Sequence, residues 1–206
     1  MKKLLIVYYS LSCGNTERVA RLLQSHTGAD LLRIETAVPY PGSYDRIVEQ
    51  GKEEVLEQTE PAIKPLSLSP ESYAAIAVGS PTWWYTMAPA VRTFLHGQNF
   101  RGKTVIPFTT NGGWPGHALA DIEAACPGAQ VACPLQVRFD AEGGDRLETP
   151  EPTCTPGRMP SAPCWRTPPG TTRRRMPPLT LPTSLAAAHP TPPMRLISPA
   201  IPTSGR

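Results

Sequence analysis

Residues 10–16 form the first of three stretches whose side chains are suited to hold a ligand. They read Ser-Leu-Ser-Cys-Gly-Asn-Thr and lie between an apolar run and an amphipathic one. The hydroxyls of Ser10, Ser12 and Thr16, with the free backbone N–H groups of a helix start, would cradle an anion. The stretch has neither the lysine of a nucleoside-triphosphate P-loop nor the G-x-G-x-x-G of a dinucleotide site. We therefore expect it to hold a single phosphomonoester; the alternative is an ordinary helix cap.

Residues 79–89 form the second stretch, which is rich in aromatic side chains. Trp83, Trp84 and Tyr85 follow one another directly, just after an apolar run. Adjacent residues of an extended loop cannot all point into one core. At least one ring is therefore expected to face a crevice and stack on a flat aromatic ligand. The alternative is a hydrophobic lid over the edge of a sheet.

Residues 109–117 form the third stretch, which combines glycines with another aromatic ring. Gly112, Gly113 and Gly116 allow the backbone to approach a ligand closely, and Trp114 lies among them. The alternative is a connector made of turns.

The elements that must position these stretches alternate along the chain. Strands are expected at Leu4–Tyr9, Leu31–Ile34, Ala74–Gly79, Lys103–Thr109 and Val131–Phe139, the last broken by Pro134. Helices are expected at Thr16–His26, at Tyr44–Glu57, from Pro89 and at Ala118–Ala125. Within the second helix, the residues expected to face inward are Ile47, Val48, Val55 and Leu56, and those expected to face outward are Glu49, Glu53, Glu54 and Glu57. This pattern predicts an α/β fold with a doubly wound, five-stranded parallel sheet. Right-handed crossovers then bring all three stretches to one edge of that sheet.

Residues 1–151 resemble the flavodoxin family, which binds FMN. The S-x-S-x-G-N-T stretch resembles the phosphate loop of that family, and P-T-W-W-Y-T-M-A-P and G-G-W-P-G resemble two loops around the isoalloxazine ring. The resemblance implies strand order 2-1-3-4-5 with FMN at the carboxyl ends of the strands. The residues it places in the phosphate loop are Ser10, Ser12, Cys13, Gly14, Asn15 and Thr16. Those that would flank the ring are Pro81, Thr82, Trp83, Trp84 and Tyr85 on one side and Asn111, Gly112, Gly113 and Trp114 on the other. Of these, Trp84 or Tyr85 is favoured for direct stacking on the ring.

Charge and proline content divide the chain near Glu151. Residues 1–151 carry all 17 acidic residues and a net charge of −4, whereas residues 152–206 carry seven arginines, no acidic residue and 14 of the 26 prolines. This composition predicts a globular domain followed by a disordered tail. The family resemblance implies a last helix where the tail begins. We hypothesise that a reading-frame shift replaced it, the alternative being a genuine extension.

Composition also indicates which cellular compartment and which kinds of partner are expected. No apolar run approaches the 18 residues that a membrane-spanning helix needs, and nucleic-acid binding by Arg173-Arg174-Arg175 is not expected. Five cysteines without scaffold spacing favour a reducing, cytoplasmic setting.

The resemblance implies electron transfer through bound FMN, with a redox protein as partner. The alternative is an NAD(P)H-dependent quinone or flavin reductase, and a third possibility is a binding module that has lost catalysis. No Asp or Glu lies between Ser72 and Ala120, a span that includes both ring loops. We therefore expect reduced flavin to be less destabilised by charge than in strongly acidic carriers. Oligomeric state is left open.

Overall fold

The computed structural model describes residues 4–40, 42–141 and 144–149. Its strands are β1 (Leu4–Tyr8), β2 (Asp30–Arg33), β3 (Ala75–Trp83), β4 (Thr86–Met87), β5 (Thr104–Asn111), β6 (Gln130–Val131) and β7 (Leu135–Arg138). Its helices are α1 (Asn15–Thr27), α2 (Tyr44–Leu56), α3 (Pro89–His96) and α4 (Ala118–Ala124), with a short 3-10 turn at Pro70–Ser72. Among these described helices, none is long and apolar enough to cross a bilayer.

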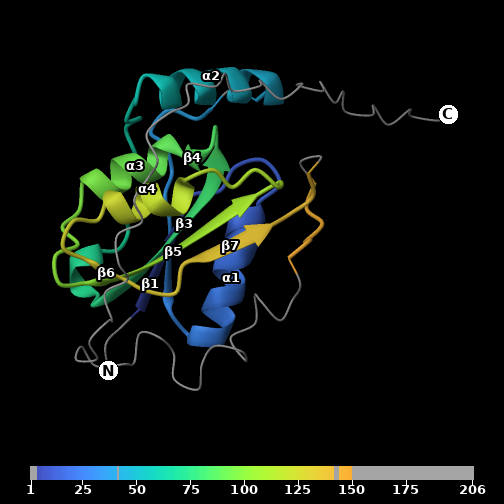
Figure 1. Cartoon of the computed structure of the whole chain (residues 1–206). Helices are drawn as coiled ribbons and strands as arrows, with labels where there is room; N and C mark the ends of the chain where they lie inside the picture. Colours follow the sequence, from blue (N-terminus) through green and yellow to red (C-terminus); the bar gives the residue numbers. More distant parts are fainter. Residues whose placement is uncertain (1–3, 41, 142–143, 150–206) are drawn as a thin grey trace, which may run out of the picture. The chain divides into compact units, whose positions relative to one another are not determined.

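The sheet has the predicted doubly wound order. β2, β1, β3 and β5 pair side by side and in parallel, and β6 and β7 both pair with the far edge of β5 (Figure 1). The last predicted strand is thus present in two pieces, separated at residues 132–134. The interruption falls at Pro134, as expected for a residue that lacks a backbone N–H.

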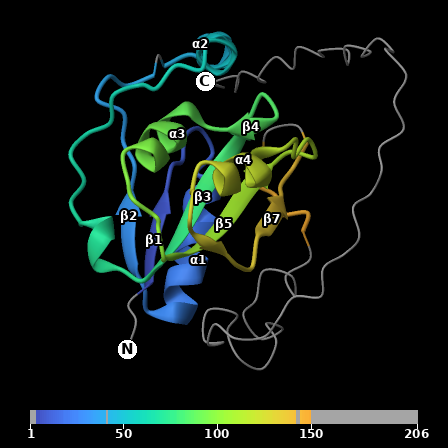
Figure 2. The same cartoon turned by 60° about the vertical axis from the view of Figure 1, so that its left-hand side comes forward.

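Alternate residues of β1 point to opposite faces of the sheet and so enter two cores. Leu5, Val7 and Tyr9 pack in the core that contains α3 and Ile122 of α4, whereas Ile6 and Tyr8 pack in the core beneath α1. Figure 2 shows α3 and α4 in front of the sheet and α1 behind it. Apolar residues on both faces are what a central parallel strand requires.

The stretch predicted to be an extended loop after Gly79 is largely a hairpin. β3 continues to Trp83 and turns back through β4, with Trp83 paired to Thr86. The strand extends because its backbone still has neighbours: Pro81 remains paired with Thr110 of β5, and the next two residues pair with β4. The aromatic residues therefore sit at the tip of a defined hairpin.

The predicted faces of α2 are partly wrong. Leu56, expected to face inward, is 73% exposed, and Glu54, expected to face outward, is buried. The Tyr40 hydroxyl donates to Glu54 Oε2 at 2.5 Å, and Gln50 donates to Glu54 Oε1 at 2.7 Å. The reason is that α2 packs through Gly51, which lies on the same helix face as Glu54. A satisfied carboxylate replaces an apolar side chain at this contact.

The chain after β7 folds back along that strand. Phe139 pairs antiparallel with Leu147, and the Glu148 N–H donates to the Arg138 carbonyl at 2.9 Å. The predicted boundary at residue 151, the tail at 152–206 and its reading-frame hypothesis lie outside the described residues.

Replacing Gly79 with alanine should destabilise the protein. An added Cβ would lie 2.1 Å from Cζ of Phe108, which is fully buried on β5. Overpacking of this kind costs about 1–3 kcal/mol. Urea unfolding should show this loss for G79A and little change for G97A, whose added Cβ meets only ordinary contacts at 3.4 Å or beyond. Equal stability of the two variants would contradict the close packing of β3 on β5.

Candidate functional site

Residues 10–16, which connect β1 to the first turn of α1, have a backbone that is suited to bind an anion; we call them the phosphate-type loop. Ser12 and Gly14 both have positive φ, at 57° and 72°, and α1 begins directly afterwards. The Ser10 hydroxyl is buried and accepts the Glu17 N–H at 3.2 Å, so it stabilises the first helical turn. Ser12 and Cys13 lie exposed at the outer part of the loop.

Two contacts tie this loop to distant parts of the chain. Thr16 and Thr110 are both buried, and their Oγ1 atoms lie 2.8 Å apart in a hydrogen bond between α1 and β5. Asn15 Nδ2 donates to the Gly144 carbonyl at 3.0 Å, whereas its Oδ1 is buried without a hydrogen-bond partner. The loop is therefore held to β5, which leads into the glycine-rich stretch, and to the segment that follows β7.

The negative charge nearest the loop is balanced by cations. Glu17, in the first turn of α1, forms ion pairs with Arg21 at 2.7 Å and Arg33 at 3.1 Å. Arg33 also donates to the Ser10 carbonyl at 3.1 Å. The helix start thus retains its preference for an anion despite the glutamate.

The aromatic stretch forms a strained two-residue hairpin turn. Trp84 and Tyr85 both have positive φ, at 47° and 68°, as in a type I′ turn that usually holds Asn and Gly. For bulky side chains this conformation costs on the order of 1–3 kcal/mol per residue. Such strain persists only where the surrounding structure holds it in place.

Helix α2 provides that support. The Trp83 ring packs edge-on against Tyr9 and Tyr40, with ring centroids at 5.9 and 5.3 Å, and an added Cβ on Gly51 would lie 3.0 Å from it. The Trp84 indole N–H donates to the Val48 carbonyl at 3.3 Å. Both tryptophans are therefore held by α2, while Tyr85 remains 44% exposed.

The phenols of this aromatic cluster stay protonated. Burial, followed by the nearby Glu54 carboxylate, raises the pKa of Tyr9. For Tyr40, burial and the hydrogen bond to Glu54 raise the pKa in the same way. Tyr40 therefore remains the donor that links the chain before α2 to the helix itself.

The glycine-rich stretch forms an ordered turn after β5. The Asn111 side chain accepts the Gly113 N–H at 2.8 Å, and Gly113 has φ 107°, which favours glycine. The Arg138 guanidinium of β7 lies against Gly113, because an added Cβ there would be 3.4 Å from its Cζ and Nη2 atoms. Trp114 is 64% exposed.

The two ring loops touch each other. An added Cβ on Gly116 would lie 2.0 Å from the Tyr85 carbonyl oxygen, and the His117 N–H donates to that oxygen at 2.7 Å. The three predicted stretches are therefore linked at one edge of the sheet by the Thr16–Thr110 bond and by the contacts of Tyr85 with the glycine-rich turn.

Sequence reasoning missed two charged groups at the ring loops. Asp121 of α4 accepts hydrogen bonds from Thr86 and from His117 Nδ1, the latter at 2.5 Å, which brings a carboxylate to a region expected to lack one. Arg138 brings a cation to Gly113. The spacing from His117 to Asp121, one helical turn, is a signal that could have revealed the first group; no local pattern reveals the second.

The buried threonine pair should be energetically coupled. T16V or T110V keeps the side-chain shape but strands the other hydroxyl, at a cost of about 1–3 kcal/mol each. The double variant should lose less than the sum, with a coupling of about 1 kcal/mol in a urea-unfolding cycle. Combining T16V with T104V, at the opposite end of β5, serves as the additive control. Additivity of T16V and T110V would show that the bond does not join α1 to β5.

Solved structures share this fold. A protein from Bacteroides eggerthii, provisionally assigned as a flavoprotein, is 29% identical over 69% of this chain and 92% of its own, with a TM-score of 0.59. A second from Bacteroides uniformis, assigned in the same way, is 26% identical over 68% and 94%, with a TM-score of 0.60. A flavoprotein from Lactobacillus acidophilus, solved in complex with FMN, is 22% identical over 66% and 93%, with a TM-score of 0.57. A comparison with curated protein sequences gives no significant match.

A family model described as flavodoxin matches residues 3–135, which include the phosphate-type loop, the aromatic hairpin and the glycine-rich turn. Because this match covers well over half of the chain and agrees with the observed sheet order, the chain belongs to the flavodoxin family.

Proposed function

We propose that this protein binds FMN at the carboxyl edge of its sheet and mediates electron transfer through the bound flavin. The observation that carries the proposal is the junction of the three predicted stretches: Thr16 bonds to Thr110, and Tyr85 contacts Gly116 and His117. FMN has a phosphate and a flat aromatic ring, which would occupy the phosphate-type loop and the two aromatic loops respectively.

The residues present fit FMN in their chemistry. Within the described residues, four buried side-chain polar atoms have no hydrogen-bond partner: Tyr9 Oη, Asn15 Oδ1, Thr82 Oγ1 and Arg92 Nη1. Two of them lie at the predicted site, Asn15 Oδ1 in the phosphate-type loop and Thr82 Oγ1 at the aromatic hairpin. Buried polar atoms normally have partners. The hydroxyls and amides of a bound ligand would supply them.

Each loop would have a separate task. The phosphate would be bound by N–H groups and hydroxyls of the phosphate-type loop, whose residues are Ser10, Ser12, Cys13, Gly14, Asn15 and Thr16. The two ring loops would enclose the isoalloxazine. Their residues are Pro81, Thr82, Trp83, Trp84 and Tyr85 on one side and Asn111, Gly112, Gly113 and Trp114 on the other. Since Trp83 and Trp84 are held by α2, Tyr85 and Trp114 are the exposed aromatic side chains available for contact with the ring. When bound, FMN would supply the redox chemistry, and the chain sets its position and local charge.

An NAD(P)H-dependent quinone or flavin reductase is the second candidate. It is favoured by the sparse acidic charge at the ring loops, where Asp121 is already engaged by Thr86 and His117. Reduced flavin would then be less destabilised than in an acidic carrier. Turnover of NAD(P)H with a quinone by the FMN-loaded protein would support this candidate, whereas exchange with a redox protein alone would support the carrier.

FMN titration of the purified full-length chain tests the proposal. Flavin fluorescence should be quenched with micromolar or tighter affinity, because aromatic side chains at the ring loops quench a stacked isoalloxazine. Circular dichroism on the same sample reports the fold. A folded protein that does not bind FMN would refute the proposal.

G116A should weaken FMN binding by pushing the two ring loops apart. Its Cβ would overlap the Tyr85 backbone, and its φ is 53°. We expect the FMN dissociation constant to rise at least about tenfold, roughly 1.4 kcal/mol. The matched control is G128A, which has similar backbone strain at φ 78° but contacts Arg101 away from the loops. It should lose stability and keep its FMN affinity. Equal FMN affinity of the two variants would show that contact between the loops is not needed.

A further inference from the structure

We propose that Arg138 is the residue that sets the electrostatic preference of the ring site for reduced over oxidised flavin. The inference rests on the proposed FMN site and goes beyond it, since Arg138 lies outside every stretch that the sequence pointed to. It concerns a positioned positive charge rather than a catalytic group.

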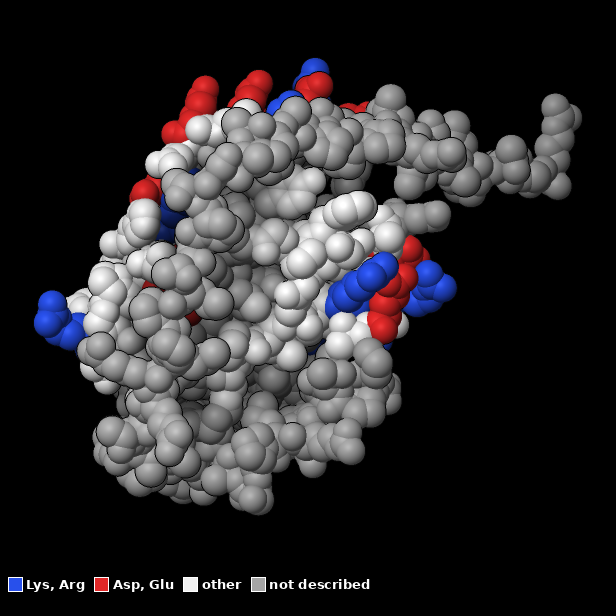
Figure 3. Space-filling view, in the orientation of Figure 1, with Lys and Arg blue, Asp and Glu red and all other residues white. Residues whose placement is uncertain are grey.

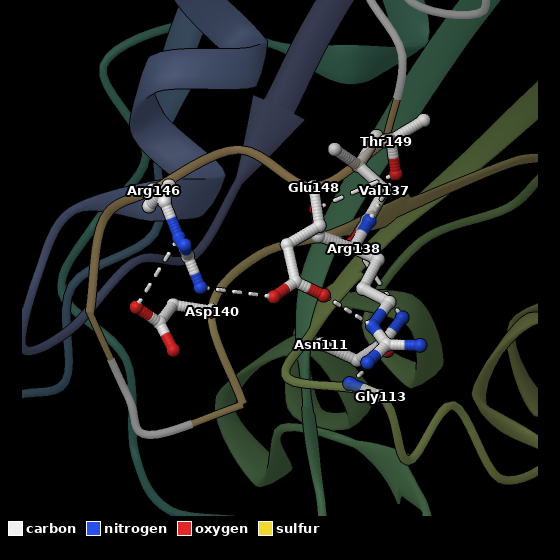
Figure 4. Close-up of polar contacts among 8 residues, drawn as sticks. All are labelled: Asn111, Gly113, Val137, Arg138, Asp140, Arg146, Glu148 and Thr149. Carbon is white, nitrogen blue, oxygen red and sulfur yellow. Dashed lines mark hydrogen bonds and ion pairs between the residues drawn. The ribbon is translucent and has the colours of Figure 1, made fainter.

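The guanidinium of Arg138 is held in place from two sides. Its Nε forms an ion pair with Glu148 Oε2 at 2.7 Å, and its Cζ and Nη2 lie against Gly113 (Figure 4). The backbone is equally constrained, because the Arg138 carbonyl accepts the N–H groups of Glu148 at 2.9 Å and Thr149 at 3.0 Å. A side chain that is 54% exposed is thus kept at the ring loop instead of moving freely in solvent.

The contact with Gly113 matters because this glycine lies in a loop that is predicted to flank the isoalloxazine. The Gly113 N–H is already directed to the Asn111 side chain, so the turn has a defined shape. Any side chain in place of this glycine would meet the guanidinium at 3.4 Å. The cation therefore packs directly on the backbone of a predicted isoalloxazine loop.

The other charges near the ring loops are arranged differently. Lys52 of α2 lies over the Trp84 ring on the aromatic hairpin, with its Nζ 5.4 Å from the ring centroid. Asp121, on the side of the aromatic hairpin, is engaged by Thr86 and His117. Arg146 belongs to the same ionic group as Arg138, since it lies 3.4 Å from Glu148 Oε1 and 3.7 Å from Asp140 Oδ2. Figure 3 shows basic and acidic side chains gathered where β7 and the segment after it lie in Figure 1, beside an uncharged surface.

The physical consequence is a bias toward the reduced cofactor. Two-electron reduction adds negative charge to the isoalloxazine, whereas oxidised FMN carries none on its ring. A nearby cation therefore stabilises the reduced form more. Glu148 moderates this effect because its carboxylate pairs with the same guanidinium.

The decisive comparison is R138Q with R146Q, which remove the same charge from the same ionic group. Dissociation constants for oxidised FMN and anaerobic redox titration with a reference dye give the ratio of reduced to oxidised dissociation constants. In R138Q this ratio should rise about three- to tenfold, within the range expected for a partly exposed charge. A tenfold rise corresponds to a two-electron potential about 30 mV lower. R146Q should change the ratio by less than about twofold.

Two further variants test the sign and the origin of the effect. E148Q leaves the Arg138 charge unbalanced and should shift the ratio in the opposite direction, and R138K should retain most of the wild-type ratio. The effect of R138Q should shrink in high salt, because exposed charges are screened. In the flavin-free protein, the Gly113 amide NMR signal should move more in R138Q than in R146Q. Thermal unfolding of each variant confirms that it folds.

The outcomes separate the two proposals. If the wild-type protein binds FMN but R138Q and R146Q have equal ratios, the role of Arg138 is refuted while the FMN site stands. If R138K behaves like R138Q, packing and not charge is responsible, which also overturns the assignment. If the folded wild-type protein does not bind FMN, both proposals fail.

Discussion

The parallel pairing of β3 with β5 is the constraint on which the rest of the structure depends. Seven residue pairs, from Ala75 with Thr104 to Pro81 with Thr110, keep the two strands in register up to their carboxyl ends. Gly79 makes this possible by leaving space for the Phe108 ring. Because Pro81 of β3 lies level with Thr110 of β5, the aromatic hairpin and the glycine-rich turn emerge beside each other and beside the start of α1. A shift of one residue would reverse the side-chain faces and separate Thr110 from Thr16.

The site is supported by elements that contribute no loop of their own. Helix α2 holds Trp83 and Trp84, and its buried Glu54 fixes the preceding chain through Tyr40. The strained turn at Trp84 and Tyr85 is kept in place by these contacts and by Gly116 on the other side. An aromatic loop that is rigid before the ligand arrives loses less conformational entropy on binding.

The charged groups at the ring loops come from α2, α4 and β7, not from the loops themselves. Asp121 contacts Thr86, and Arg138 contacts Gly113. The loops are free of acidic residues in the sequence, yet the fold brings a carboxylate to Thr86 and a guanidinium to Gly113. The electrostatics of the cofactor site are therefore a property of packing between distant segments.

The sequence by itself determined the α/β class and the three stretches at the sheet edge, and the strand order followed from the family resemblance. Hydrophobic runs, helix starts and glycine-aromatic clusters are local signals that require no knowledge of neighbours. Tertiary structure alone decided that β3 continues to Trp83, because that extension depends on the pairing of Pro81 with Thr110. It also decided that Glu54 is buried, since Gly51 brings α2 close to Trp83. Tertiary structure also decided that Arg138 lies against Gly113. The cause is the register between β5 and β7, which pairs Asn111 with Arg138, and neither segment carries a local pattern that sets this register.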